Sequence, residues 1–193
     1  MGTGRPVTGR RDPRVVRSRE RVLAAAVALV AEKGMSGATI EAVAARSGVA
    51  KTTIYRQWPH QAALVLEAFR GAAPDAPAAD SGSLRDDLVG LLGGLADALT
   101  SGPAALLMAA LLDAAGRDAD FAELHAQEAR RRHRPVLAVM ELGLANGELP
   151  ADADLDELLD RLAGPVFHRR FVSGLPLDRR FVEHVVDTVL AAP

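Results

Sequence analysis

The 193-residue sequence contains no cysteine, which excludes disulfide bonds and thiolate metal sites. It also lacks any run of about 18 or more uncharged apolar residues, the length that a membrane-spanning helix needs. The N-terminus has no apolar signal core. We therefore expect a cytoplasmic protein with no membrane partner.

Catalytic and cofactor signatures are missing as well. The sequence has no nucleophile elbow, no phosphate-binding glycine loop and no dinucleotide fingerprint. His125, His168 and His184 lie far apart, and none belongs to an i, i+4 histidine pair or to the His–Glu arrangement of zinc enzymes. We predict no enzymatic activity, no catalytic residues, no metal and no cofactor.

The net charge of −2 conceals two parts of opposite sign. Residues 1–70 contain 12 Lys or Arg and 5 Asp or Glu, a net charge of +7, whereas residues 71–193 carry −9. A positive N-terminal third is the electrostatic footprint of a phosphate-binding domain. The acidic remainder is unsuited to a polyanion.

Residues 39–58, TIEAVAARSGVAKTTIYRQW, have the pattern of two short helices joined by a tight turn, the second beginning at about Lys51. Two helices that cross within one short turn need a small residue where they touch and a residue in the turn that tolerates positive φ. They also need an apolar residue on the second helix that packs between them. Ala44, Gly48 and Ile54 fill these three places. This pattern is typical of a DNA-reading helix-turn-helix, and an ordinary helical hairpin is the alternative.

Helices are expected on both sides of this stretch. Upstream, residues 18–34 form an amphipathic pattern, with Ser18 as the candidate N-cap and Gly34 as the stop. Downstream, residues 58–69 start another helix, with Pro59 at a position where the missing amide donor is tolerated.

The run of residues 18–69 closely resembles the DNA-binding domain of the TetR (tetracycline-repressor-like) family. The residues that carry this resemblance are Gly34, Thr39-Ile40, Val43-Ala44, Gly48-Val49, Thr53-Ile54-Tyr55, Trp58-Pro59 and Ala63-Leu64. Three positions depart from the family pattern, one of them Ala62, which stands where members usually have an acidic residue. Ala50 stands where members usually have Ser, and Gln61 where they usually have a Lys that often touches a DNA phosphate.

A recognition helix usually docks in the major groove of DNA with its first residues and outer face towards the base edges. We expect the second helix of this pair to dock in the same way. The resemblance implies that Tyr55 contacts a phosphate, and His60 at a helix N-terminus could bind another. The predicted DNA-binding residues are Thr39, Lys51, Thr52, Thr53, Tyr55, Arg56, Gln57 and His60. The alternative for each is a solvated side chain.

Changes in composition along the sequence indicate the domain boundaries. Residues 1–17 hold five arginines and no apolar periodicity, so we expect a disordered basic arm that contacts DNA, or a solvated tail. Residues 18–70 are the predicted helix-turn-helix domain, 71–83 a linker, and 84–193 a C-terminal domain for ligand binding and dimerisation.

The C-terminal domain is expected to be helical throughout, because apolar residues recur at helical spacing and no segment alternates with period two. We therefore predict an all-α protein of about nine helices, with a three-helix DNA-binding domain at its N-terminus. Pro135 falls inside one helix, so a kink is expected near Arg132. We interpret the arginine cluster at 130–134 as a solvated face or a charge partner for the acidic C-terminal domain, rather than as a second nucleic-acid site.

The family resemblance implies a small, often apolar ligand enclosed by the middle helices. Candidate wall residues are Leu106, Met108, Leu111, Phe121, Met140 and Phe167. Ordinary core packing is the alternative for these residues, since burial alone produces stripes at helical spacing.

The resemblance implies a repressor that is released from a palindromic double-stranded DNA operator by an unidentified small-molecule effector. We expect a homodimer in which the apolar stripes of the last two helices pair across a twofold axis, with Gly164 permitting close approach. The alternatives are a helical-bundle interaction protein and a constitutive DNA-binding protein without a ligand switch.

Overall fold

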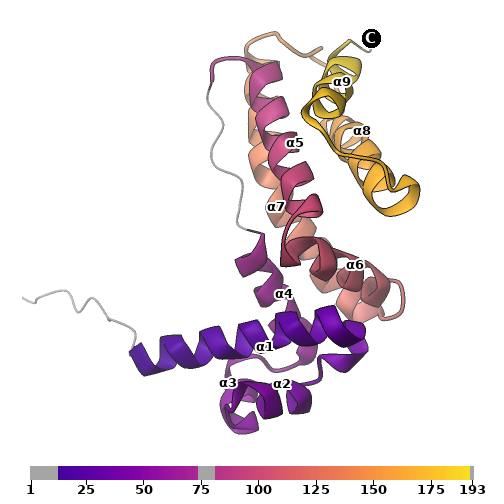
Figure 1. The fold of residues 1–193 in the computed structure, drawn as a ribbon. Coiled ribbons are helices and arrows are strands. Elements are labelled where there is room, and N and C mark those ends of the chain that lie inside the picture. Colours follow the sequence, from indigo (N-terminus) through magenta and orange to yellow (C-terminus); the bar gives the residue numbers. More distant parts are fainter. Residues whose placement is uncertain (1–12, 74–80, 192–193) are drawn as a thin grey trace, which may run out of the picture. The chain divides into compact units, whose positions relative to one another are not determined.

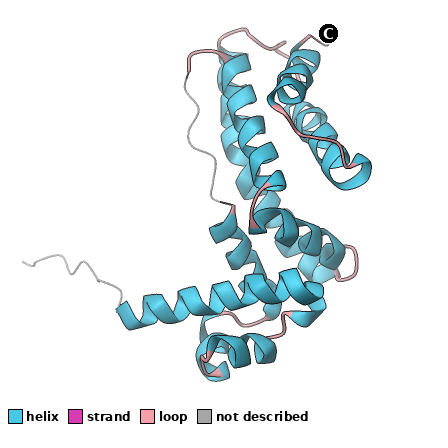
Figure 2. Ribbon diagram, in the orientation of Figure 1, coloured by secondary structure: helices cyan, strands magenta, loops and turns pink. Residues whose placement is uncertain are grey.

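The computed structural model describes residues 13–73 and 81–191 (Figure 1). The regular structure of these residues is entirely helical, with nine α-helices, one π-helical turn and no strand (Figure 2). The all-α prediction and the predicted number of helices are confirmed. The chain divides into two compact units, with the boundary between Ala68 and Phe69.

The first unit contains three helices and the start of a fourth: α1 (Pro13–Gly37), α2 (Ile40–Ser47), α3 (Lys51–Gln57) and α4 (Gln61–Ala72). α1 packs against α2, and α2 packs against α3. The most deeply buried side chains are apolar residues at helical spacing, among them Val22, Val43, Ile54 and Leu64. The chain leaves this unit inside α4.

α1 differs from the prediction at its start. It begins at Pro13, five residues before the predicted cap Ser18, because proline suits a first helical turn, where the missing amide would have no partner. Residues 13–17 of the predicted arm are therefore helical, and residues 1–12 lie outside the described residues. Gly34 ends the regular part of α1 with φ 69°, which confirms the predicted stop.

The second unit contains the end of α4, five further helices and one π-helical turn: α5 (Leu84–Thr100), α6 (Pro103–Ala115), α7 (Ala119–Ala145), α8 (Leu155–His168), η1 (Arg169–Ser173) and α9 (Arg179–Leu190). Aspartates at positions 118, 154 and 178 accept hydrogen bonds from the first amides of α7, α8 and α9. α7 remains helical through Pro135. The central part of the predicted linker, residues 74–80, lies outside the described residues.

α5 is the central helix of the second unit and packs against α6, α7, α8 and α9. Its leucines recur at helical spacing and are buried together with residues of α7, α8 and α9. Arg170, in η1, donates to the carbonyl of Leu99 at 2.6 Å and so ties the α8–α9 connection to the end of α5. One core therefore holds all the long helices of this unit.

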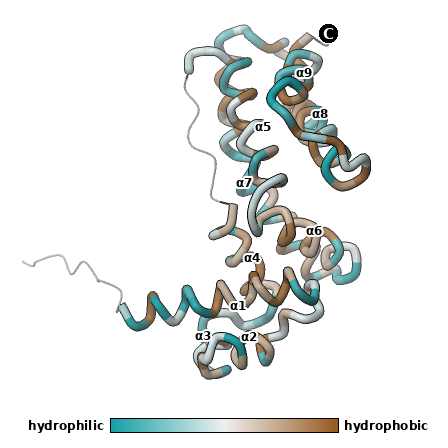
Figure 3. Tube along the Cα trace, in the orientation of Figure 1, coloured by the Kyte–Doolittle hydropathy of each residue, from teal (hydrophilic) through white to brown (hydrophobic). Residues whose placement is uncertain are grey.

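The apolar stripe of α9 belongs to this core. Val182, Val185, Val186 and Val189 are buried within the single chain, and Figure 3 shows the resulting alternation of hydrophobic and hydrophilic positions along α9. The stripe is therefore not free to pair with a second chain, and that part of the prediction is wrong. α5 occupies the face that the sequence pattern assigned to a partner.

A buried carboxylate on α7 binds the last turns of α4. Glu128 is 2% exposed, and its oxygens lie 2.6 Å from Arg70 of α4 and 2.7 Å from Arg131. Arg132 adds a third contact at 3.1 Å. The arginine cluster therefore serves largely as a set of charge partners, one of the two predicted interpretations.

Arg132 also binds α4 directly. Its Nη2 donates to the carbonyl of Ala73 at 2.5 Å, and its guanidinium lies 4.4 Å from the centre of the Phe69 ring. A cation at the C-terminal end of a helix is favoured by the helix dipole. The end of α4 is thus held by charge, hydrogen bonding and stacking.

The acidity of Glu128 reflects this environment. Burial alone would raise the pKa of its carboxyl, but hydrogen bonds from Arg131 and Arg70, together with their charges, lower the pKa from 4.5 to about 2. A lowered pKa in the folded state means that the stabilisation is present above pH 4.5 and is lost as the pH falls towards 2. The shift corresponds to roughly 3 kcal/mol.

We predict that Glu128→Gln lowers the free energy of unfolding at pH 7 by roughly 3 to 5 kcal/mol, because three arginines lose their buried anion. Urea denaturation followed by circular dichroism measures this change. Glu123→Gln is the matched control, since its exposed carboxylate on the same helix accepts from Arg130 and Gln127 at the surface, and the change should cost less than about 1 kcal/mol. Equal losses in the two variants would contradict the assigned role of Glu128.

Candidate nucleic-acid interface

The helix-turn-helix has the predicted local structure. Thr39 caps α2, its Oγ1 accepting from the amide of Ala42 at 3.2 Å. Gly48 adopts φ 67°, and its amide donates to Ala44 at 3.0 Å, which closes the helix in the left-handed conformation that glycine tolerates. α3 begins at Lys51 as predicted, without a side-chain cap from Ala50.

α3 is a seven-residue helix with one buried and one exposed face. Ile54 is fully buried and supplies the predicted apolar plug. Four of the predicted DNA-binding residues are exposed on α3, namely Lys51, Thr52, Tyr55 and Arg56, whereas Thr53 and Gln57 are half-buried. Thr39 is half-buried as a cap, and His60 is exposed. The outer face of α3 is therefore polar and open.

A buried tryptophan fixes the end of α3. Trp58 follows the helix, is 2% exposed, and donates from Nε1 to Oε2 of Glu67 in α4 at 2.8 Å. Arg19 of α1 lies 5.6 Å from the Trp58 ring and forms an ion pair with Oε1 of Glu67 at 2.5 Å. These contacts join α1, α4 and the end of α3. Sequence reasoning missed Glu67 and Arg19, because a buried indole requires an acceptor but does not identify it.

The start of α3 carries an internal ion pair that the sequence reasoning also missed. Nζ of Lys51 lies 3.3 Å from the carboxylate of Glu41, in the first turn of α2. The pKa of Glu41 is lowered, first by a hydrogen bond from the backbone amide of the same residue and then by Lys51. Glu41 is thus ionised at neutral pH, and a phosphate that binds Lys51 has to compete with it.

His60 has a local role in addition to the predicted one. Its Nδ1 accepts a hydrogen bond from the amide of Ala63 at 3.2 Å and so caps α4, which begins at Gln61. That amide is therefore not available to a phosphate. The amide group of Gln61 donates to the backbone carbonyl of Met35, which gives this departure from the family pattern a structural role.

The predicted ligand-wall residues are distributed over the second unit. Met108, Met140 and Phe167 pack in the same core, Met140 being almost fully buried. Leu111 and Phe121 are also buried, whereas Leu106 is 54% exposed on α6. Burial of this kind is compatible with both alternatives, a ligand wall and ordinary core. These assignments stay predictions.

Neither a metal cluster nor a single membrane-spanning helix is found in residues 13–73 and 81–191. No group of three or more His, Cys, Asp or Glu side chains in this part of the chain could hold a metal ion. No single helix there is long and apolar enough to cross a membrane. α5 and α6 satisfy that criterion only as a pair, bent by 85°.

Two family models match the chain. One describes bacterial regulatory proteins of the tetR family and matches residues 22–68, and the other describes the tetracyclin repressor-like C-terminal domain and matches residues 78–189. Together they cover both units. The chain belongs to the TetR family of transcriptional regulators. It is therefore a DNA-binding regulator, and the proteins that it resembles are regulators rather than enzymes.

Individual proteins of the TetR family are similar to this chain over most of its length. An uncharacterised HTH-type regulator of Bacillus subtilis, YdeS, is 31% identical over 176 residues, 90% of this chain and 88% of that protein. The DNA-binding transcriptional repressor TetR of Mycobacteroides abscessus is 30% identical over 177 residues, 88% of this chain and 90% of that protein. The crystal structure of the TetR-family regulator SCO0332 has a TM-score of 0.73 and 32% identity, covering 92% of this chain and 100% of that chain.

Proposed function

We propose that this protein is a homodimeric repressor that acts in the cytoplasm, binds a palindromic DNA operator through α3, and is released by a small-molecule ligand. The observation that carries the DNA-binding part is the open polar face of α3 on a unit of positive charge. Ligand release is supported by family membership and by the contacts of α4. A constitutive DNA-binding protein without a ligand switch is the competing proposal.

DNA recognition is assigned to the exposed residues of α3. Arg56 can form bidentate hydrogen bonds with a guanine edge or a phosphate, and Lys51 can bind as a point charge. Thr52 and Tyr55 add hydroxyl groups on the same surface. Because a single seven-residue helix reads few base pairs, two copies related by a twofold axis are needed for a specific site.

We predict that Lys51→Ala and Arg56→Ala each weaken operator binding roughly tenfold or more while the protein stays helical. Gel shifts on DNA from around the encoding gene identify the operator, and fluorescence anisotropy then measures affinity. Arg117→Ala is the control, since this exposed arginine lies in the second unit and pairs with Asp113. Full affinity in both α3 variants would overturn the assignment.

Dimerisation is assigned to the exposed faces of α8 and α9 rather than to their buried stripes. On α8, Gly164 is exposed, and a Cβ atom added there would meet no other atom within 4 Å. Asp160, Arg161 and His168 lie exposed around it. A second helix can approach closely at a glycine, with polar residues at the rim.

We predict that Gly164→Arg converts a dimer into a monomer of 20.3 kDa without loss of helicity. Sedimentation at micromolar concentration measures the mass. Gly90→Arg is a matched control, since Gly90 is an exposed helical glycine on α5 with equally open surroundings. Val185→Glu would not serve, because Val185 is buried within the chain. A wild-type monomer, or an unchanged mass for Gly164→Arg, would contradict this surface.

Release of DNA by a ligand requires that a change in the second unit is transmitted along α4. The contacts of Glu128 provide a path for this, because Glu128 and Arg132 of α7 hold Arg70, Phe69 and Ala73 at the end of α4. A ligand that favours another position of α7 would act on α4. A preference of about 1 to 3 kcal/mol between two states changes operator affinity roughly 5- to 150-fold.

We predict that an inducer binds more weakly in the presence of the operator, by the same factor by which it weakens operator binding. Lipophilic drugs and metabolites are screened by thermal shift, and each hit is titrated with and without operator DNA. A ligand with identical affinity in both titrations is not an inducer. A broad screen that yields only such ligands would favour the constitutive alternative.

A further inference from the structure

The first two turns of α1 extend beyond the hydrophobic core of the first unit. The buried residues of α1 begin at Val22, whereas none of residues 13–21 is buried. This segment contains four arginines and one acidic residue, Glu20. In Figure 3 it is mostly hydrophilic, in contrast to the middle of the same helix. Core packing therefore does not explain the extension.

Three exposed arginines share one face of this segment. Arg14, Arg17 and Arg21 are separated by three and four residues, the spacings that return to the same side of an α-helix. We call these three residues the arginine ridge. Over seven residues it extends roughly 10 Å along the helix axis.

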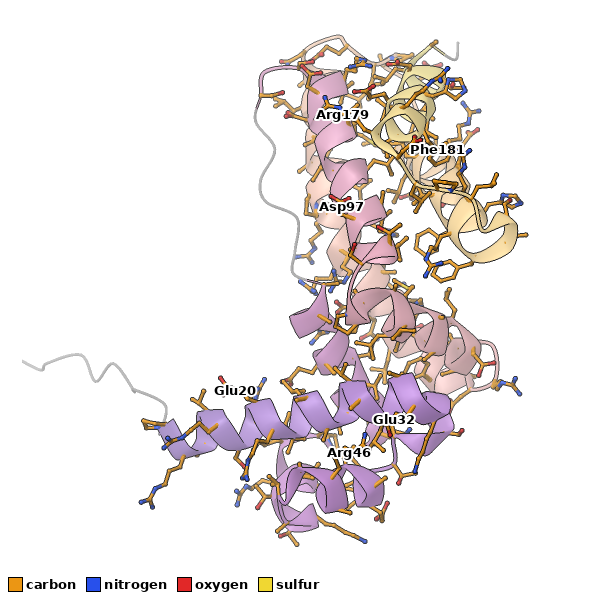
Figure 4. All side chains as sticks on the ribbon, in the orientation of Figure 1. Glu20, Glu32, Arg46, Asp97, Arg179 and Phe181 are labelled. Carbon is orange, nitrogen blue, oxygen red and sulfur yellow. The ribbon has the colours of Figure 1, made fainter. Side chains whose placement is uncertain are left out.

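An ion pair further along α1 shows which way the ridge faces. Glu32 follows Arg21 by 11 residues, or about three turns, and therefore lies on the same face. Its two carboxylate oxygens accept from Arg46 of α2, both at 2.8 Å. In Figure 4, Glu32 and Arg46 mark the adjoining parts of α1 and α2. The ridge thus continues, towards the N-terminus, the side of α1 on which α2 lies.

A second contact shows that the same stretch of α1 passes close to the end of α3. Arg19 lies between Arg17 and Arg21 in the chain, and its guanidinium is 5.6 Å from the ring of Trp58, which directly follows α3. Arg19 is two residues from both Arg17 and Arg21, so the ridge lies on another side of α1, and the contact places this stretch of the helix close to the C-terminal end of α3 in the same compact unit.

We propose that the arginine ridge binds the phosphate backbone of DNA beyond the base pairs that α3 reads. This inference rests on the proposed function of α3. A guanidinium binds phosphate bidentately and remains charged at every relevant pH. Arg17 and Arg21 form no ion pair with any described residue, so no carboxylate has to be displaced from them. The ridge adds affinity and lengthens the contacted site, but it carries no base readout.

The test uses the double variant Arg17→Ala/Arg21→Ala in the full-length dimer. Alanine preserves helix formation, and Arg19 is left intact because it contacts Trp58. Anisotropy measures affinity for two duplexes, the operator alone and the operator extended by about 10 base pairs on each side, over a range of salt concentrations. Arg117→Ala/Arg130→Ala, two exposed arginines of the second unit that lie outside the proposed dimer surface, is the matched control.

The wild type should bind the extended duplex at least several-fold more tightly, and the ridge variant should bind both duplexes equally. The slope of log affinity against log salt should become shallower by about 0.9 for each phosphate that the variant no longer neutralises. If the ridge variant keeps the wild-type salt slope and the wild-type preference for the longer duplex, the proposal that the ridge binds phosphate is wrong. If Arg56→Ala still weakens operator binding in that case, α3 keeps its proposed function and only the proposed role of the ridge is wrong. If both variants bind normally, the proposed function fails as well.

Discussion

The DNA-binding surface depends on how a very short helix is held in place. A seven-residue helix is unstable on its own, because nucleation is costly and only a few hydrogen bonds follow it. α3 is fixed from inside by Ile54 and at its end by Trp58, whose indole donates to Glu67. The exposed side chains of α3 can present a defined pattern to DNA only while these two anchors hold.

The middle and the end of α4 are held by the same kind of interaction. In the middle, Glu67 binds Trp58 and Arg19, and near the end Arg70 binds Glu128. Each carboxylate is partly or fully withdrawn from water, and removing a partner from such a group costs more than breaking a surface pair. α4 is therefore fixed by directional contacts rather than by apolar packing alone.

Much of this arrangement was predictable from local sequence patterns. Caps at Thr39 and Asp118, the turn at Gly48 and the plug Ile54 follow from short-range rules that depend on a few neighbouring residues. The pairing of Trp58 with Glu67, and of Glu128 with Arg70, was not predictable. A charged residue on a helix has many partners available, and periodicity does not distinguish among them.

The error at α9 has a related cause. The spacing of its valines correctly predicted a buried face, since a hydrophobic stripe identifies the side of a helix that avoids water. It does not identify what covers that side. In this chain α5 covers it.

The arginines of this chain differ in whether a carboxylate lies within ion-pair distance. In the second unit, Arg70, Arg85 and Arg179 are each matched by a nearby carboxylate, in keeping with its excess of acidic groups. On the first unit, Arg17, Arg21 and Arg56 form no ion pair with any described residue. A phosphate that binds them replaces water and counterions only, whereas at Lys51 it must also displace Glu41. Under the proposed function, Arg17, Arg21 and Arg56 would therefore bind phosphate without losing an ion pair.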